Sequence, residues 1–449
     1  MLHYDLIVLG SGNAGMAAAS AVRAAGKSVA VVEKGEFGGT CPIKGCVPKK
    51  VLVAAAEVLH EIKNASQHHI RVQGTEIDWA SLIERKQSFV EGVSEDFSRS
   101  LTAKGIDLYE GIAKFVGPRT ISAGSHTLSA EAIVIATGSR PRPLAIKGGE
   151  RTITSDDLLN LDSLPESLIA IGGGVIALEF AHVLARAGTR VTVLESTSTL
   201  LPRFDMDLVQ VLTQECERIG ITVITGVQVT EISKHGSAFE VHFNEHDGTT
   251  RILSAQTILN GTGRIPDIDE LELDAAEIEH DGSRIVVDDY LRSTSNPKVF
   301  VAGDALWSSA QLSPLATYEG NIVGRNIAQG PLQRPDYRTV PSAVFTIPPL
   351  VTVGLTESQA KNDGLDYTVK VNDMTGWRSA RMHAETVAFS KVLLEKDKDR
   401  ILGAHLIGHG GDEIIHLFSL AMRHEISATK LKEQFIVYPT YSSDIKYMI

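Results

Sequence analysis

The stretch YDLIVLGSGNAG occupies residues 4–15 and is the strongest fold signal in the chain. It reads as a buried apolar strand that runs into a Gly-x-Gly-x-x-Gly turn, and an Ala-rich helix follows. Gly10 permits the tight turn, Gly12 lets a pyrophosphate approach the backbone, and Gly15 lets the helix pack on the strand. The next strand ends at Glu33, 23 residues after Gly10, about where a ribose-binding carboxylate is expected. The stretch predicts a dinucleotide-binding βαβ unit.

A second copy of this unit begins at residues 167–179, SLIAIGGGVIALE. Ala177 takes the third glycine position, which the fingerprint allows, and the following strand ends at Glu195, again 23 residues after the first glycine. A carboxylate at that position accepts hydrogen bonds from both ribose hydroxyls and repels a 2′-phosphate, so it favours NADH over NADPH. Arg190 and Arg203 lie nearby in the sequence and leave NADPH open.

Two cysteines follow the first unit directly, in the run GGTCPIKGCVPKK at residues 38–50. Cys41 and Cys46 are separated by four residues, a spacing that suits either a redox dithiol or a pair of zinc ligands. No second Cys/His pair with ligand spacing follows, and Cys216 stands alone on an expected helix. The sequence therefore favours a redox pair and no metal site.

The composition of the 449 residues is that of an ordinary globular protein and predicts about three domains. A formal net charge of −12 argues against a nucleic-acid-binding surface. The longest apolar runs fall far short of the ~20 residues that span a bilayer. The first residues carry no pattern of a secretion signal, so we expect a cytoplasmic protein without a membrane segment.

Together, these motifs resemble those of the flavin-dependent pyridine nucleotide–disulfide oxidoreductases, which include dihydrolipoamide dehydrogenases, glutathione reductases and mercuric reductases. Further segments match the family in order: IVIATGSRP at 133–141, LNGTGRIP at 259–266, VFVAGD at 299–304 and QLSPLA at 311–316. The resemblance covers essentially the whole chain.

The resemblance implies an α/β fold with two Rossmann-like domains and a C-terminal α+β dimerisation domain, hence a homodimer. Its boundaries would be residues 1–145 for the first part of the FAD-binding domain, 146–265 for the NAD(P)H-binding domain, 266–335 for the return to the FAD-binding domain and 336–449 for the dimerisation domain. Within the last domain we expect strands at 341–346, 351–355, 386–395 and 401–407, and a helix at 412–422.

The implied activity is that of an FAD-dependent NAD(P)H oxidoreductase. Electrons would pass from the nicotinamide through the flavin to a Cys41–Cys46 disulfide, and then to a disulfide or another thiol-reactive oxidant. Cys46 would be the thiolate next to the flavin and Cys41 the thiol that attacks the substrate. Lys50 matches the lysine beside the flavin and Glu179 its ion-pair partner, although a surface lysine would look the same.

The resemblance also assigns residues to the two cofactors, namely Gly10, Gly12, Asn13, Ala14, Gly15, Glu33, Lys34, Gly39, Thr40, Cys46, Lys50, Ala113, Thr137, Gly138, Ser139, Gly172, Gly174, Val175, Ile176, Glu179, Glu195, Gly263, Asp304, Leu312, Ser313 and Ala316.

The C-terminal run VYPTYSSD, residues 437–444, departs from the family pattern His-Pro-Thr-x-x-Glu. Tyr438 stands at the position of the acid/base histidine and Ser443 at that of the glutamate that orients it. A tyrosine with a pKa near ~10 does not shuttle protons at neutral pH as histidine does. Mercuric reductases combine a tyrosine at this position with both cysteines. We therefore count Tyr438 among the catalytic residues.

Two further hypotheses follow from this departure. Lys44, between the cysteines, would hold Cys41 as a thiolate in place of the lost histidine, or it is only a solvated loop residue. The activity itself has rivals: a transhydrogenase, diaphorase or quinone reductase that works at the flavin, a soft-metal-ion reductase, or a subunit that keeps the fold without turnover.

Overall fold

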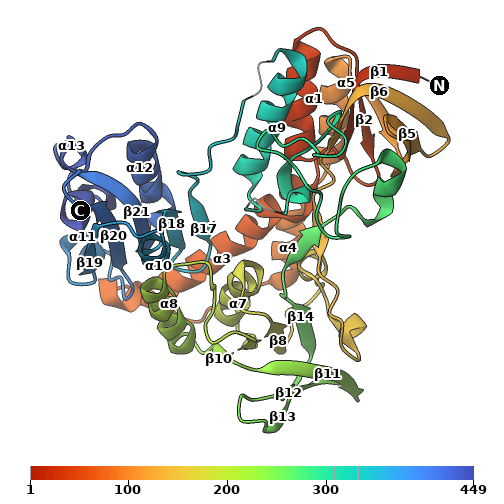
Figure 1. The fold of residues 1–449 in the computed structure, drawn as a ribbon. Coiled ribbons are helices and arrows are strands. Elements are labelled where there is room, and N and C mark those ends of the chain that lie inside the picture. Colours follow the sequence, from red (N-terminus) through yellow and green to blue (C-terminus); the bar gives the residue numbers. More distant parts are fainter. Residues whose placement is uncertain (1, 308–309, 331–332) are drawn as a thin grey trace. The chain divides into compact units, whose positions relative to one another are not determined.

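A computed structural model describes residues 2–307, 310–330 and 333–449. The chain forms two compact units, each built from three segments. The first unit comprises residues 1–49, 84–142 and 264–336, and the second comprises 50–83, 143–263 and 337–449. Each segment can be followed by colour in Figure 1, and each unit is described by itself.

The first unit is built around a mixed sheet in the order β3-β2-β1-β6-β5-β4, with β16 added beside β6. The strands β1, β2, β3, β6 and β16 are parallel, whereas β4 and β5 are antiparallel. The strands span Leu2–Leu9 (β1), Val29–Glu33 (β2), Asp107–Glu110 (β3), Ala113–Gly117 (β4), Thr120–Ala123 (β5), His126–Ile135 (β6) and Val299–Val301 (β16).

The apolar run of β1 is buried because neighbouring strands and helices cover it. Leu6 pairs with Val29 on one side and with Ala132 on the other, and Leu6 to Leu9 are completely buried. Near-continuous apolar strands of this kind are typical of parallel sheets covered on both faces. The helices around this sheet are α1 (Asn13–Ala24), α2 (Thr40–Lys44), α5 (Val93–Ala103) and α9 (Ser313–Ala328). A short ladder joins β7 (Ser139–Pro141) to β15 (Arg264–Pro266).

The second unit contains the other nucleotide-binding motif, on a parallel sheet in the order β10-β9-β8-β14. Its strands are β8 (Ser167–Ile171), β9 (Arg190–Leu194), β10 (Thr222–Ile224) and β14 (Thr257–Asn260). A three-stranded antiparallel sheet joins it, made of β11 (Gln228–His235), β12 (Ala238–Asn244) and β13 (Thr250–Ala255). The helices are α3 (Cys46–Asn64, whose first residues belong to the first unit), α4 (Trp79–Gln87), α6 (Ser155–Leu158), α7 (Val175–Ala187) and α8 (Met206–Arg218).

The C-terminal part of the second unit is an antiparallel sheet in the order β17-β18-β21-β20-β19. Its strands are β17 (Ser342–Val344), β18 (Leu350–Gly354), β19 (Tyr367–Asp373), β20 (Phe389–Glu395) and β21 (Arg400–Ile407). Helices α10 (Glu357–Asn362), α11 (Arg378–Met382), α12 (Gly411–Arg423), α13 (Ala428–Lys432) and α14 (Ile445–Met448) complete it.

Two of the expected strands are shorter than the sequence pattern indicates. Residues 341–346 were expected as a strand, but β17 ends at Val344, and the amide of Phe345 instead donates to a carboxylate of the neighbouring helix α7. Residues 386–388 precede β20, because the ladder with β21 begins at Phe389 opposite Ile407.

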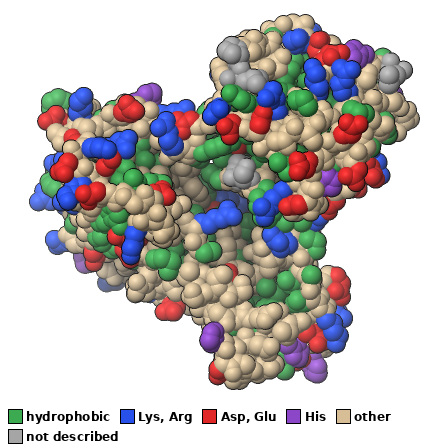
Figure 2. Space-filling model, in the orientation of Figure 1, with side chains coloured by type: hydrophobic (Ala, Val, Ile, Leu, Met, Phe, Trp, Pro, Cys, Tyr) green, Lys and Arg blue, Asp and Glu red, His purple; other side chains and the backbone are tan. Residues whose placement is uncertain are grey.

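On the face drawn in Figure 2, Lys and Arg side chains are mixed with Asp and Glu over the whole surface. Such mixing does not build the one-signed positive field that attracts nucleic acid. None of the helices in the described ranges combines the length and the apolar character needed to cross a bilayer.

Candidate functional site

The first glycine-rich turn is compact. Its glycines are required because a side chain there would collide with neighbouring backbone atoms, and not only because glycine is flexible. Gly10 has φ = +101°, and a Cβ there would lie 2.3 Å from the carbonyl oxygen of Ala136. A Cβ on Gly15 would lie 2.0 Å from the carbonyl oxygen of Gly10. Glu33, at the end of β2, accepts hydrogen bonds from the Ser11 amide at 2.8 Å and from the Ser11 hydroxyl at 2.7 Å. The carboxylate is thereby held beside the turn, at the edge where ligands of such sheets bind.

Polar side chains lie beside this turn, and one of their buried hydroxyls has no hydrogen-bond partner. The hydroxyl of Thr137 is the only buried side-chain oxygen or nitrogen among the described residues that has no hydrogen-bond partner. Asp304 accepts from the Ser139 hydroxyl at 3.0 Å, and burial raises the pKa of its carboxyl. Ser139 is held in turn by Arg264, whose Nε donates to its hydroxyl at 2.9 Å. Buried polar groups of this kind fit a polar ligand, such as the ribityl and pyrophosphate portion of FAD.

The remaining residues expected to bind FAD lie in the same unit. Gly39 (φ = +71°) precedes α2, which begins at Thr40, and a Cβ on Gly39 would lie 2.6 Å from the Cα of Gly12. Ala113 is buried in β4, and Gly138, with φ = +74°, separates Thr137 from Ser139. Lys34 is engaged in ion pairs with Asp267 at 3.0 Å and Glu270 at 2.9 Å. Lys34 therefore helps to hold the return segment beside β2, and its role towards FAD stays a prediction.

Helices α1 and α9 meet at their N-terminal ends. Ala14 is buried, and a Cβ on Gly303 would lie 2.9 Å from its methyl group and 3.3 Å from that of Ala316. Leu312 is the residue that precedes α9 and caps it. Asn13, the first residue of α1, donates its side-chain amide to the carbonyl oxygen of Ser313 at 3.4 Å and also to the Ser313 hydroxyl.

Cys41 and Cys46 are both free thiols in this structure. Cys41 lies on the short helix α2, half-buried, and Cys46 is the exposed first residue of α3. The Cys46 thiol hydrogen-bonds to Cys41 and lowers the pKa of Cys41 to about 6, although burial alone would raise it. The same hydrogen bond raises the pKa of Cys46. The two thiols therefore titrate as a coupled pair, and the donors around Cys41 favour the charge on that sulfur. The role of Cys46 as the thiolate beside the flavin stays a prediction.

A further donor to Cys41 was not anticipated from the sequence. The Ser313 hydroxyl donates to the Cys41 sulfur at 3.1 Å. Hydrogen bonds from Cys46, Ser313 and Asn13 lower the pKa of Cys41. The hypothesis that Lys44 partly replaces the histidine by holding Cys41 as a thiolate stays a prediction.

Lys50 and Glu179, expected to act as a pair, are both found around Phe345 in the second unit. The ammonium of Lys50 lies 4.2 Å from the centre of the Phe345 ring, and the carboxylate of Glu179 accepts from the Phe345 amide at 2.9 Å. Lys50 also approaches Glu57 at 3.4 Å and Asp412 at 3.8 Å. Asp412 opens α12 and was not anticipated. The expected pairing of Lys50 with Glu179 stays a prediction.

The second glycine-rich turn repeats the construction of the first. Gly172 has φ = +100°, and a Cβ there would lie 2.5 Å from the carbonyl oxygen of Gly261. Ala177 is completely buried against Gly261, which explains why alanine suffices at the third position. The other expected ligands lie at the N-terminus of α7 or at the end of this sheet: Gly174 as its N-cap, Val175 and Ile176 in its first turn, and Gly263 after β14.

Glu195 ends β9 and faces the second turn. One carboxylate oxygen accepts the Gly173 amide at 2.6 Å, and the other accepts the Thr197 amide at 2.7 Å. Burial would raise the pKa of this carboxyl, but these amides outweigh it and hold the pKa below its usual range. The carboxylate is therefore ionised at neutral pH and fixed in place.

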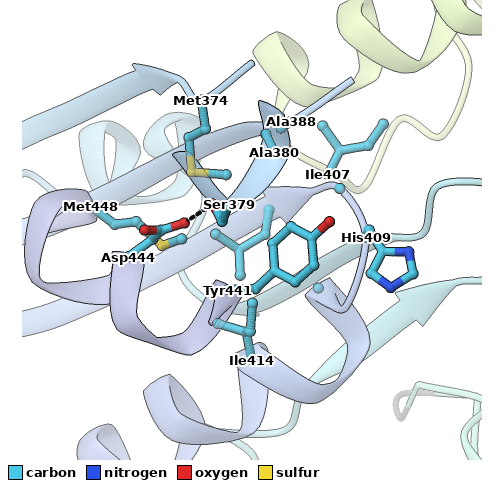
Figure 3. Close-up of a pocket in the computed structure, with 13 residues that line it drawn as sticks. Met374, Ser379, Ala380, Ala388, Ile407, His409, Ile414, Tyr441, Asp444 and Met448 are labelled. Carbon is cyan, nitrogen blue, oxygen red and sulfur yellow. Dashed lines mark hydrogen bonds between the residues drawn. The ribbon is translucent and has the colours of Figure 1, made fainter. Parts of the chain in front are cut away.

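In the C-terminal segment, Tyr438 is exposed and its hydroxyl accepts a hydrogen bond from Arg378 at 2.7 Å. Ser443 forms a capping box with Thr440 at the start of a 3-10 helix. The residue at the position of the family's glutamate therefore stabilises this helix end. Figure 3 shows Asp444 turned towards Ser379, with which it hydrogen-bonds. Asp444 is buried in its own domain and does not reach outward.

The two nucleotide-binding turns, the polar side chains beside the first one and the paired thiols define a flavin-dependent reductase with a thiol centre. Residues 4–320 match the model of the pyridine nucleotide-disulphide oxidoreductases, and residues 340–449 match the dimerisation domain of the same family. The chain belongs to the pyridine nucleotide-disulphide oxidoreductase family.

Individual relatives show the breadth of this family. The chain is 32% identical to a mercuric reductase of Bacillus cereus over 99% of its own length and 71% of that protein. It is 30% identical to a glutathione reductase of Burkholderia cepacia, over 98% and 97%. Among solved structures, the copper(II) complex of the HOCl-induced flavoprotein disulfide reductase RclA from Escherichia coli superposes with a TM-score of 0.89 at 29% identity, covering 100% of this chain and 99% of that one.

The family confirms the predicted fold class, the cofactors FAD and NAD(P)H and the class of enzyme, an FAD-dependent NAD(P)H oxidoreductase of the disulfide reductase type. It also confirms that the C-terminal part is a dimerisation domain. The individual site residues and the domain boundaries stay predictions.

Proposed function

We propose that this protein is an NADH-dependent flavoenzyme that reduces a thiol-reactive oxidant at Cys41 and Cys46. The observation that carries the proposal is the arrangement of the two free thiols, in which the Ser313 hydroxyl donates to the Cys41 sulfur at 3.1 Å and, together with Cys46, favours the charged form of Cys41. The thiolate is the nucleophile in disulfide exchange, and a low pKa keeps it deprotonated at neutral pH.

With a disulfide as substrate, the exchange balances as follows. The Cys41 thiolate attacks one sulfur, forms a mixed disulfide and releases the other half as a thiolate. Cys46 gives its proton to the released thiolate and attacks Cys41, which closes the Cys41–Cys46 disulfide and releases the second half as a thiolate. The substrate has gained two electrons that the dithiol has lost. When bound, FAD supplies the two-electron relay by which NADH returns the disulfide to the dithiol.

The residues around the cofactor sites support electron transfer from NADH through the flavin to the dithiol. The ionised Glu195 favours a free 2′-hydroxyl, and therefore NADH. A positive charge at Lys50 beside the flavin would stabilise its reduced, anionic form. We further propose that the protein is a homodimer in which Tyr438 of one subunit acts at the dithiol of the other. We also propose that it works in the cytoplasm, a reducing compartment that suits two free thiols.

A soft metal ion is the second candidate substrate. Thiolates select soft metals, and Tyr438 stands where the family's acid/base histidine is missing. The names of the relatives point the same way, since one is a mercuric reductase and another was solved as a copper(II) complex. A metal ion held by two thiolates would need no proton-shuttling histidine.

An anaerobic titration with NADH tests the proposal, with a Cys46→Ser variant as the matched control. We expect a long-wavelength thiolate-to-flavin absorbance band near half-reduction in the wild type and none in the variant. Direct bleaching of the flavin without that band would contradict the proposal.

Steady-state rates then separate the substrates. We expect Cys41→Ser to abolish NADH oxidation driven by disulfides, Hg²⁺ or Cu²⁺, and the best of these acceptors identifies the substrate class. Full activity of Cys41→Ser with quinones or nicotinamide analogues alone would support transhydrogenase or quinone reductase chemistry instead.

A further inference from the structure

The sulfur of Cys41 is surrounded by hydrogen-bond donors that come from three different helices. Cys46 is the first residue of α3, Asn13 the first of α1 and Ser313 the first of α9. Each contributes a hydrogen bond that favours the charged form of Cys41. We propose that Ser313, aligned by Asn13, is a positioning residue that keeps Cys41 deprotonated in the absence of a histidine at position 438.

The hydrogen bonds run in one direction. The side-chain amide of Asn13 donates to the Ser313 hydroxyl oxygen, and this hydroxyl donates its proton to the Cys41 sulfur at 3.1 Å. Because the Ser313 oxygen accepts from Asn13 through one lone pair, its own proton is directed to the Cys41 sulfur. Hydrogen bonds to an ionised acceptor are about twice as strong as neutral ones, and a chain of donors polarises itself further.

Helix geometry adds to this arrangement. Helices α1 and α9 are 12 and 16 residues long, and the positive ends of their dipoles lie at Asn13 and Ser313. Positive dipole ends favour a negative charge within the first turn. The donors and the dipoles therefore act together on the same sulfur.

Charged side chains also lie on the elements packed around this pair. Lys44 lies on the same short helix, Lys49 on α3 favours the charged form of Cys46, and α5, which packs against α2, carries Glu95, Asp96 and Arg99. The hydrogen-bond donors that favour the charged form of Cys41 are Cys46, Ser313 and Asn13. Ser313 and Asn13 are neutral, so their effect persists across the whole pH range of the protein.

This arrangement differs in kind from a histidine. A serine hydroxyl does not take up a proton near neutral pH, so Ser313 stabilises the thiolate without shuttling protons. The inference rests on the proposed function in assigning Cys41 as the exchanging thiol, but its chemistry can be measured without turnover.

The test is the rate of Cys41 alkylation by iodoacetamide against pH, in the reduced, FAD-loaded protein. The thiolate displaces iodide and forms a thioether. Trypsin cleaves after Lys44, so Cys41 and Cys46 appear on separate peptides in mass spectrometry. We expect an inflection near pH 6 for Cys41 in the wild type, and a shift upward by about one pH unit in Ser313→Ala, a roughly tenfold loss of thiolate below the inflection.

The controls isolate the hydroxyl. Ser313→Thr keeps the donor and should retain the wild-type inflection, whereas Ser313→Val has the same shape without the donor and should behave as Ser313→Ala. Thr102→Ala removes an exposed hydroxyl on α5 and should change nothing. FAD content is measured in each variant by absorbance, and the Thr/Val pair decides the matter if Ser313→Ala folds poorly.

An inflection in Ser313→Val that coincides with that of Ser313→Thr would overturn the inference. That result would leave the proposed function intact, since NADH titration reads the dithiol independently. Conversely, a fully active Cys41→Ser protein would remove the proposed function and leave the alkylation result standing.

Discussion

At the scale of single residues, Glu195 shows how a carboxylate is prepared before its ligand arrives. Its two oxygens already bind the amides of Gly173 and Thr197, and these bonds keep it ionised. A fixed carboxylate does not need to be ordered when a ribose binds, so less conformational entropy is lost. The same fixed charge would repel a 2′-phosphate.

We therefore predict that Glu195→Ala lowers kcat/KM for NADH by about 10- to 100-fold, because a site built to bind a hydroxyl loses its partner. The value for NADPH should fall much less, so the preference for NADH narrows. Steady-state kinetics with both nucleotides measure this. Glu217→Ala, on the exposed side of α8, serves as the control. An unchanged NADH/NADPH ratio in Glu195→Ala would show that the selectivity comes from elsewhere.

At the scale of elements, the crossing of α1 and α9 holds the first nucleotide turn in place. A Cβ on Gly320 would lie 2.2 Å from the carbonyl oxygen of Ala14, and one on Gly324 would lie 2.7 Å from the Cβ of Ala21. Small residues thus let the two backbones approach closely. The close approach places Asn13 next to Ser313, and therefore next to Cys41.

Gly320→Ala should push the two helices apart. Overpacking of this kind costs about 1–3 kcal/mol, and we expect a lower thermal midpoint together with weaker FAD retention, both of which absorbance and thermal unfolding report. Arg325→Ala changes an exposed residue of the same helix and should leave both unchanged. If Gly320→Ala behaved like this control, the packing argument would be wrong.

At the scale of the whole molecule, the dimerisation domain raises the question of which subunit supplies Tyr438. The residue is exposed, and Phe435 and Val437 beside it are largely exposed as well. Adjacent exposed apolar side chains are typical of an interaction surface. We proposed above that Tyr438 serves the dithiol of the partner.

Mixed dimers test this proposal. Cys41→Ser and Tyr438→Phe subunits, co-expressed with different tags, should each be impaired as homodimers, because one lacks the nucleophile and the other the hydroxyl. The purified mixed dimer should regain about half of the wild-type rate, because one of its two sites combines an intact Cys41 with an intact Tyr438 from the other subunit. No recovery would mean that Tyr438 acts within its own subunit, and an unimpaired Tyr438→Phe homodimer would mean that Tyr438 has no role.

Much of the fold was readable from short-range pattern. The two glycine-rich turns lie where expected, because their glycines are required by close contacts within one βαβ unit or with the strand beside it. The strand ends were less predictable, as at Phe345, whose amide turns away from the ladder towards Glu179. The antiparallel strands β11 to β13 were not anticipated, although β12 alternates apolar Phe239, Val241 and Phe243 with polar residues.

The candidate site likewise contains residues that the sequence predicts and residues that only the structure reveals. The cysteine pair, Glu33 and Glu195 are recognised by residue type and spacing, because each follows a strand or turn at a fixed distance. Ser313 and Asn13 are 300 residues apart in sequence, and no spacing rule joins them. The contact between Arg378 and Tyr438 is likewise invisible in the sequence.

The sequence by itself determined that this protein binds two nucleotides and carries two thiols separated by four residues. A strand, a turn and a helix are each specified by neighbouring residues. Only the tertiary structure shows which donors surround the Cys41 sulfur and favour its charged form. The pKa of a thiol depends on the donors and the burial around its sulfur, and these come from helices that the chain brings together only by folding.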